Sequence, residues 1–458
     1  MNPNEHPLQR SARVFDVAAR LDGWGLTAFH RWLLLLSGCI TWFDGMDFAV
    51  MAFTAPYIRD EFGLSSSQLG TLFSAAVVGQ VLGGLLITHF ADRIGRRPTI
   101  VATSFLFGLL TLITALASTY PHLLLIRFLD GLAIGGMLPV AWALNIEFAP
   151  RTRRASVVAT IMLGYSLGSA AAGPLTNLVA PGQGWQGVYV WAGIGTLLAA
   201  AALYFWLPES VRFLVAKRGD SARVAAALNR VEPAIAATAN DRFVLSDEAH
   251  AGPRFHVRQL FRGDLRFITP LIWAAYTASS FAIFLSSTWG PLLLEGLHVP
   301  RRTAALVASI SGLLGAVGGM LLVRRTEHLG PRGVMICPAI ALPLLLVIGL
   351  GLPPDNVVWM LVPVFGMLLG AGHTAIVSIA GVYYPSSIRA SGGGWATSVA
   401  KCGAVFGPLA GGAILASGLP VIRTYAFLAF YPVVVCAAMA GIAIVLRRRP
   451  RDDSAPHP

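Results

Sequence analysis

The chain has 458 residues, of which 55% are hydrophobic and 12% are charged, and this balance is too apolar for an ordinary soluble protein. A formal net charge of +12 could suit nucleic acid, but the basic residues lie between apolar stretches and at the termini, so membrane topology explains them better. The four cysteines lie inside apolar stretches without C-x-x-C spacing, which argues against a disulfide framework or a metal site.

Twelve apolar stretches are long enough to cross a bilayer as helices, since about 20 mostly apolar residues span the hydrocarbon core. The sequence therefore predicts an all-α integral membrane protein with twelve transmembrane helices. In chain order the predicted spans are 32–56, 69–90, 98–118, 122–146, 155–179, 187–207, 267–293, 303–323, 334–352, 357–381, 392–416 and 425–446.

The polar segments between the spans alternate in charge. Those after the second, fourth, sixth, eighth and tenth spans are rich in arginine, whereas those after the third, fifth and ninth contain no lysine or arginine. Because basic loops favour the cytoplasmic side, we expect both termini to be cytoplasmic, as an even number of spans requires. The N-terminal segment lacks a short apolar core with a cleavage site, so we predict no cleaved signal peptide.

The longest polar interruption divides the chain into two halves of six predicted spans. Within it, residues 210–230 combine scattered apolar residues with charged ones, which is consistent with a short cytoplasmic helix. A small soluble domain is the alternative to a linker. The predicted organisation is a cytoplasmic segment at 1–31, a six-helix bundle at 32–207, a cytoplasmic linker at 208–266, a second six-helix bundle at 267–446 and a cytoplasmic tail at 447–458.

A seven-residue signature occurs once in each half. Pro150–Ser156 and Pro385–Ser391 both fit P-x-x-x-R-A-S and lie 235 residues apart. Gly131 and Gly366 are separated by the same 235 residues. A register shared by separate segments indicates two homologous, pseudo-symmetric bundles. Duplicated bundles bind a substrate at the interface between the halves, near the bilayer midplane, so the pattern favours a transporter.

Asp44 and Asp47 lie inside the first predicted span, where ionisable groups are costly and commonly mark pathways or proton relays. Their spacing of three places both on roughly one helix face, where two poorly hydrated carboxylates resist being ionised together. We predict that both take part in proton coupling. The alternative is a structural pair that arginine or backbone groups satisfy.

Arg127 and Asp130 form a second pair at a spacing of three, in the fourth span. They can stabilise each other as a structural strut. The functional hypothesis is that this pair belongs to the proton-coupling site, with Arg127 exchanging partners with Asp44 or Asp47 as protons and substrate arrive. Glu147, at the inner end of the span, is predicted to be a gating or surface residue.

Lys401 is a cation deep in the eleventh span, and the spans of its own half offer no carboxylate. An isolated ammonium group there needs an anion, supplied either by the acids of the first half across a cavity or by the substrate, which we favour. His373 in the tenth span could donate a hydrogen bond to a substrate or titrate, or it could be a packing histidine.

Aromatic residues in the candidate cavity spans could contact a ring-shaped substrate, although interfacial belts and packing also explain such residues. For this role we select Trp273, Tyr276 and Trp395. The chain shows no metal cluster, nucleophile–base pair or glycine-rich phosphate loop, so we expect neither an enzyme nor a cofactor.

The loop after the second span, Ala91-Asp92-Arg93-Ile94-Gly95-Arg96-Arg97, resembles a motif of the major facilitator superfamily, and so does Arg127 followed by Gly131 and Gly135. The resemblance covers nearly the whole chain and implies two six-helix bundles. In the family, Asp and Arg residues of this loop latch the cytoplasmic helix ends. The predicted gating residues are Asp92, Arg93, Gly95, Arg96, Arg97, Glu147, Arg154 and Arg389.

Other motifs resemble the aromatic acid:proton symporters of bacteria. Asp44-Gly45-Met46-Asp47 is similar to their D-G-x-D in the first helix, and Glu147-Phe148-Ala149-Pro150 to their E-[YF]-x-P at the end of the fourth. Leu207-Pro208-Glu209-Ser210 fits the end of their sixth helix. The chain departs from the family at Lys401, where an arginine is usual, at Gly372-His373 and at Asp130.

Together these features predict a secondary active transporter of the bacterial inner membrane that imports an aromatic or similar organic carboxylate with protons. The proton gradient would supply the energy, and the carrier is expected to function as a monomer without nucleic acid. The alternatives are a proton-coupled importer of a non-aromatic organic anion or a sugar, an exporter, and a non-transporting sensor.

Overall fold

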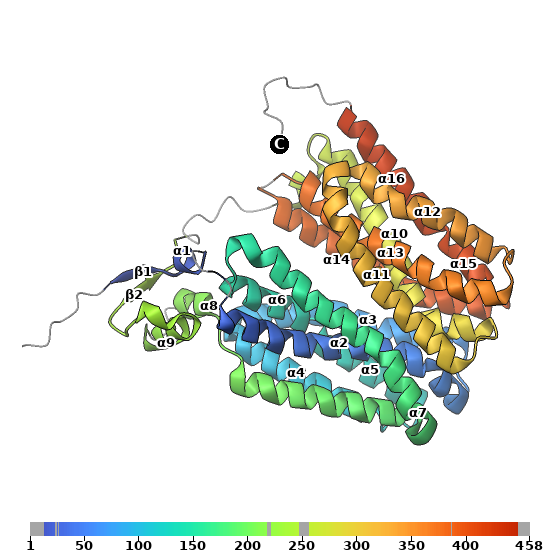
Figure 1. Cartoon of the computed structure of the whole chain (residues 1–458), viewed down its shortest axis with the longest axis horizontal. Helices are drawn as coiled ribbons and strands as arrows, with labels where there is room; N and C mark the ends of the chain where they lie inside the picture. The colour runs from blue at the N-terminus through green and yellow to red at the C-terminus, as the bar shows by residue number, and fades with distance from the viewer. Residues whose placement is uncertain are drawn as a thin grey trace, which may run out of the picture.

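Long helices in two adjacent halves form most of the protein (Figure 1). The computed structural model describes residues 13–22, 25, 27–217, 221–246, 256–385 and 387–447. The first half contains α2 (Ala28–Phe62), α3 (Ser66–Ile94), α4 (Arg96–Thr114), α5 (Tyr120–Ile134), α6 (Met137–Phe148) and α7 (Arg154–Trp206). The second half contains α10 (Leu265–Gly296), α11 (Arg301–Leu329), α12 (Pro331–Gly349), α13 (Asp355–Tyr383), α14 (Arg389–Ala416), α15 (Arg423–Leu428) and α16 (Phe430–Arg447).

Among the described residues, eleven helical segments are long and apolar enough to cross a membrane. One of them covers Arg151–Trp206 and has 56 residues, so a continuous helix would be about 84 Å long, far longer than the hydrocarbon core. Gly184 interrupts it with φ 69° and ψ 179°, and the chain reverses direction within α7 (Figure 1). Because α7 supplies two antiparallel spans, the predicted twelve-helix fold class is confirmed.

Helix boundaries follow local sequence signals. The Ser65 hydroxyl accepts a hydrogen bond from the Gln68 amide at 3.2 Å, while the Gln68 side chain accepts one from the Ser65 amide at 2.9 Å, a reciprocal cap that starts α3. Gly63 ends α2 in the left-handed region with φ 62°, a conformation that glycine adopts without steric cost. The fourth predicted span is divided at Gly135 and Gly136 into α5 and α6.

Glycines let α2 and the first part of α7 approach until their backbones touch. A Cβ atom at Gly168 would overlap the carbonyl oxygen of Trp42, and one at Gly45 would overlap that of Tyr165. Small residues allow this approach in membrane helices, where close packing replaces the hydrophobic driving force. The contact fixes the stretch of α2 that carries Asp44 and Asp47.

The N-terminal segment and the segment between the halves form one small unit, which we call the clasp. It comprises β1 (Val14–Asp16), α1 (Val17–Asp22), α8 (Val211–Ala216), α9 (Ser221–Val231), the short helix η2 (Pro233–Ile235) and β2 (Arg242–Val244). Strands β1 and β2 pair in parallel, and Arg13 forms an ion pair with Asp241 at 3.4 Å. The clasp lies at one end of the first half (Figure 1).

Apolar side chains of the clasp share a core with the first half. Val17, Leu21, Val224 and Leu228 are buried in the same hydrophobic cluster as Phe148 of α6. This burial explains why the two polar segments, predicted as an N-terminal segment and a linker, are folded in part. We call this end of the molecule the clasp end and the opposite end, where α2 finishes, the far end.

The two halves are joined at the far end by polar contacts. Arg301 of α11 pairs with Asp60 of α2 at 2.9 Å, and with Glu295 of its own half at 3.0 Å. Farther inside, the Ser74 hydroxyl donates to the Val405 carbonyl at 2.8 Å. The ribbons of the halves diverge toward the clasp end (Figure 1).

The pair between Arg301 and Asp60 is partly exposed, and such pairs contribute about 0.2–1 kcal/mol. We therefore expect Arg301→Gln to increase opening of the far end by roughly two- to fivefold. The measurement is the rate at which a thiol reagent labels a cysteine placed at the buried Ser74, in a background without native cysteines.

The matched control is Arg302→Gln, because the Arg302 side chain is exposed and Asn177 binds only its backbone carbonyl, at 2.8 Å. The control should label like the parent protein. Equal labelling in the parent and Arg301→Gln would show that this bridge does not hold the far end closed.

Candidate functional site

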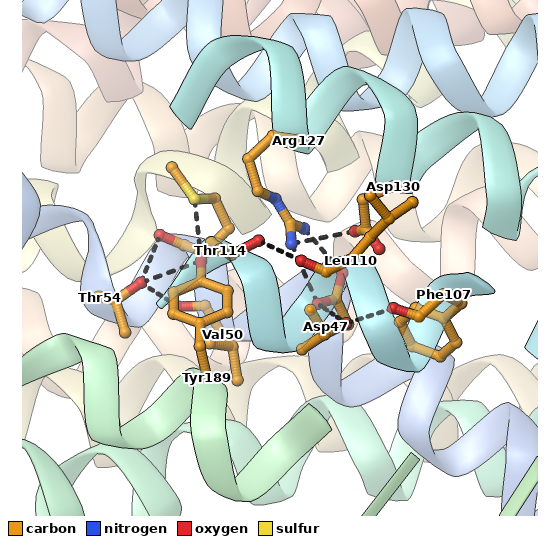
Figure 2. Close-up of polar contacts among 11 residues, drawn as sticks. Asp47, Val50, Thr54, Phe107, Leu110, Thr114, Arg127, Asp130 and Tyr189 are labelled. Atoms are coloured by element: carbon orange, nitrogen blue, oxygen red, sulfur yellow. Dashed lines mark hydrogen bonds and ion pairs between the residues drawn. The ribbon is translucent and has the colours of Figure 1, made fainter. Parts of the chain in front are cut away.

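The central feature of the first half is a buried ion pair between α2 and α5. The Arg127 guanidinium donates to both carboxylate oxygens of Asp47, with Nη1–Oδ1 at 3.1 Å and Nη2–Oδ2 at 2.7 Å (Figure 2). This two-point geometry is the strong form of an arginine–carboxylate contact. Thr111 of α4 donates a longer hydrogen bond to Asp47 Oδ1 at 3.4 Å. The structure thus places Arg127 on Asp47, one of its two predicted partners.

Asp130 approaches the same guanidinium from α5 itself. Its Oδ2 lies 3.0 Å from Arg127 Nη1, the nitrogen that also donates to Asp47 (Figure 2). Neither oxygen of Asp130 accepts a well-aligned hydrogen bond, and Arg127 Nε has no acceptor. The predicted pair therefore exists, but it is the weaker of the two contacts that Arg127 makes.

Tyr189 from the second part of α7 covers the other side of this group. Arg127 lies 5.6 Å from the centre of the Tyr189 ring, a cation–π distance. The Tyr189 hydroxyl lies 3.1 Å from the Met51 sulfur and 3.4 Å from the Thr54 hydroxyl. Sequence reasoning did not select Tyr189, because one tyrosine in an apolar span carries no signal of its neighbours.

A small cavity connects this ionic cluster with the boundary between the halves. Its volume is about 20 Å³, which is room for about one water molecule. The cavity is lined by Asp47, Arg127, Asp130 and Gln80 from the first half and by Thr288 from α10 of the second. The cluster is therefore not sealed within its own bundle.

Asp44 is buried one turn before Asp47, but it stands apart from the ion pairs. Among the described residues no basic side chain pairs with it, and Tyr165 of α7 lies beside it. A buried carboxylate without a counter-ion is stable only when it is protonated. The two acids of the first span consequently differ in chemistry: Asp47 is paired and Asp44 is not.

Lys401 lies on α14 at the boundary between the halves. Its ammonium nitrogen faces Gly84 of α3, where an added Cβ would lie 3.3 Å from it. The side chain is half-buried, and among the described residues no carboxylate pairs with it. The acids of the first half therefore do not neutralise Lys401 in this conformation.

The other predicted binding residues form two aromatic groups within the second half. The Trp273 and Trp395 rings stack with centroids 6.3 Å apart, and Trp395 is 40% exposed. The Tyr276 and His373 rings pack edge to face, with their centroids 5.4 Å apart. The Ser279 hydroxyl lies 2.9 Å from His373 Nδ1, a partner that the sequence did not indicate.

The predicted gating loop makes its contacts inside the first half. Arg96 pairs with Glu147 of α6 and with Asp92, each at 3.2 Å. Glu209 accepts hydrogen bonds from the amides of Arg96 and Arg97 at 3.0 and 3.2 Å, as a carboxylate does at a helix N-terminus.

Backbone geometry explains the glycine of this loop. Gly95 has φ 112°, and a Cβ atom there would overlap the Glu209 carboxylate. The Ser210 hydroxyl donates to Glu147, so Glu209 and Ser210 tie the end of α7 to this loop. Both come from the motif that ends the sixth predicted span, although neither was selected as a site residue.

The remaining predicted gating residues also stay within their own halves. Arg154 lies 3.6 Å from Asp22 of the clasp, whereas Arg389 donates to the Tyr384 carbonyl at 3.4 Å. Arg97 donates to the Tyr204 carbonyl at 2.7 Å, and Arg93 is exposed. Within the described part of the chain, no group of three or more metal-ligating side chains could hold a metal ion.

Comparison with known proteins identifies the family. A sequence profile of the Major Facilitator Superfamily matches residues 38–372 and 272–458. The gallate transporter of Pseudomonas putida is 33% identical over 410 residues, which cover 88% of this chain and 90% of that protein. The 4-hydroxybenzoate transporter PcaK of the same species is 29% identical over 451 residues, 98% of either chain.

A solved structure shares the fold. It is a bacterial homologue of the human lysosomal transporter Spinster in an inward-facing and occupied conformation, with a TM-score of 0.72 and 18% identity over 94% of this chain and 100% of that chain. The profile match and the long alignments with aromatic acid transporters agree with the motifs in the first, fourth and sixth spans. The chain therefore belongs to the major facilitator superfamily and, within it, to the aromatic acid:proton symporter family.

Proposed function

We propose that this membrane transporter imports an aromatic or similar organic carboxylate together with protons across the bacterial inner membrane. The observation that carries the proposal is the buried ionic cluster of the first half, which reaches the boundary between the halves through a cavity. Relatives named for gallate and 4-hydroxybenzoate support the substrate class. The proposed activity is transport rather than catalysis, driven by the proton gradient.

The charges in the first half support the proposed proton coupling. Asp44 and Asp47 are 3% and 2% exposed, and Arg127 neutralises Asp47. No cation among the described residues is in contact with Asp44, so a proton is the available neutralising partner. When the site is hydrated from either side, this proton can leave or return, and a carboxyl group that exchanges protons in this way is the requirement for coupling.

Substrate binding is assigned to the second half and the boundary. Lys401 supplies a positive charge that no carboxylate of the described residues pairs with, and the substrate carboxylate would provide the counter-ion. Trp395 and Trp273 present stacked rings, while Tyr276 and His373 offer a second aromatic edge with polar atoms. These are the chemical groups that a ring bearing a carboxylate and hydroxyls requires.

Alternating access is supported by the distribution of contacts. The bridge between Arg301 and Asp60 holds the far end together, whereas the gating residues at the clasp end pair within their own halves. We assign the clasp end to the cytoplasm, which makes this conformation inward-facing and places both termini inside.

Different affinities of proton and substrate for the two conformations supply the bias between them. A single chain contains all of these groups, so the monomer is the proposed functional unit.

Purified protein in proteoliposomes should accumulate 4-hydroxybenzoate when the outside is more acidic than the inside, and a protonophore should abolish the accumulation. Counterflow with benzoate-type acids, dicarboxylates and hexoses then defines the substrate class. Exchange of hexose but not of any aromatic acid would reject the proposed substrate, and flux that ignores the proton gradient would reject symport.

Asp44→Asn and Asp47→Asn should each abolish proton-driven accumulation, measured as uptake under a pH gradient. Asp44→Asn removes a proton site, whereas Asp47→Asn also leaves Arg127 without its main partner, which costs about 3–5 kcal/mol of stability. Asp47→Glu keeps the charge and separates the two effects. Glu232→Gln, in the clasp, is the control and should transport normally. If both asparagine variants still accumulate substrate, these acids are not the coupling groups.

Lys401→Ala should lose most affinity for a benzoate-type anion, because the substrate carboxylate loses its counter-ion, whereas Lys401→Arg should keep part of it. Equilibrium binding to detergent-solubilised protein measures this difference. Lys217→Ala is the matched control, since Lys217 lies at the end of α8, near the Phe213 ring. Unchanged affinity in Lys401→Ala would exclude this residue from the binding site.

A further inference from the structure

We infer that Asp130 binds a second transported proton, so that each cycle moves two protons with one monocarboxylate and carries one net positive charge inward. This inference rests on the proposed symport, and it adds the proton stoichiometry. Asp44 holds the proton that uptake requires under any gradient, and Asp130 holds a second proton, which adds to the coupling without being required for transport.

The first step is a charge count in the buried cluster. Asp44, Asp47 and Asp130 are 3%, 2% and 0% exposed, and Arg127 is 2% exposed. With all three acids ionised, three negative charges would face one positive charge, away from water. Uncompensated buried charges are strongly unfavourable, so the cluster is stable when two of its three carboxyl groups hold protons.

The contacts show which acid remains ionised. Asp47 receives both Nη groups of Arg127 and the Thr111 hydroxyl, and a carboxylate with several donors favours its charged form. No hydrogen-bond donor of this kind reaches Asp44 from the part of the chain that the structure describes. Asp130 touches only Nη1, which already donates to Asp47, and its oxygens receive no aligned hydrogen bond. Asp44 and Asp130 are therefore the protonated acids.

The surroundings of Asp130 also favour a protonated form. Its Oδ2 and Oδ1 of Asp47 lie on the same nitrogen, Arg127 Nη1, at 3.0 and 3.1 Å. The two carboxyl groups are therefore neighbours, and a proton on Asp130 removes the repulsion between two ionised carboxylates. The charged and titratable groups that face it are Asp44 and Asp47 from α2, Arg127 from α5 and Tyr189 from α7. Among the described residues, Arg127 is the one cation paired with this cluster.

A route for this proton is present as well. The cavity lined by Asp130 and Asp47 continues to Thr288 of the other half, and it has room for about one water molecule. The proton on Asp130 can reach the boundary through that water when the halves separate. Lys401, on α14, neutralises the substrate, so the anion and the two protons occupy different groups and can be carried together.

The stoichiometry is measurable as the limit of accumulation. At zero membrane potential, a pH gradient of about one unit should sustain about hundredfold accumulation of 4-hydroxybenzoate with two protons per anion, and about tenfold with one. Without a pH gradient, an inside-negative potential of about 59 mV should sustain about tenfold accumulation with two protons and none with one. Potassium gradients with valinomycin set the potential in proteoliposomes.

Asp130→Asn should fold, since an amide reproduces the shape of the neutral acid and, like it, carries no charge. It should keep uptake driven by a pH gradient at the tenfold limit and lose the response to potential, whereas Glu232→Gln should behave as the parent protein. Wild-type uptake without a response to potential would overturn the inference. So would an Asp130→Asn variant that is unfolded, inactive or still at the hundredfold limit. No wild-type uptake under either gradient would instead reject the proposed symport itself.

Discussion

A single buried guanidinium organises the first half of this transporter. Arg127 connects α2 to α5 through Asp47 and also contacts Asp130 on its own helix. Taking an arginine out of water is tolerable only when its charge is matched at short distance, so the position of α2 relative to α5 is tied to this contact. Glycines hold the first part of α7 against the same part of α2, which brings Tyr165 to the acids.

The ions of the two halves have different surroundings, and this difference is the basis for the separate tasks that we propose for them. The cluster in the first half is buried and paired within itself, with one small cavity at its side, which suits the exchange of protons. Lys401 in the second half is less buried and has no carboxylate partner among the described residues, which suits a ligand that arrives and leaves. A substrate that displaced Asp47 from Arg127 would have to break a two-point ion pair, whereas binding at Lys401 breaks none.

Apolar length, loop charge and the repeated signature were sufficient to predict twelve spans, because bilayer thickness and backbone hydrogen bonding leave a membrane chain few options. Spacing also singled out Asp47, Arg127 and Asp130, since charges in apolar spans are conspicuous. Their pairing could not be derived, because it depends on how α2 and α5 rotate against each other. Tyr189 and Ser279 carry no such charge. A short helix was expected within residues 210–230, but the pairing of β1 with β2 escaped prediction because these strands are three residues long and lie far apart in the sequence.

The pairing of β1 with β2 makes the chain's beginning part of the connection between the halves. Strand β2 ends at Val244 and α10 begins at Leu265, so 20 residues, not the whole predicted linker, separate the clasp from α10 in the sequence. A polypeptide divided just after Val244 would keep its strand pair intact within the N-terminal fragment. Division before Arg242 would strip that fragment of β2 and leave the backbone groups of β1 without their partners.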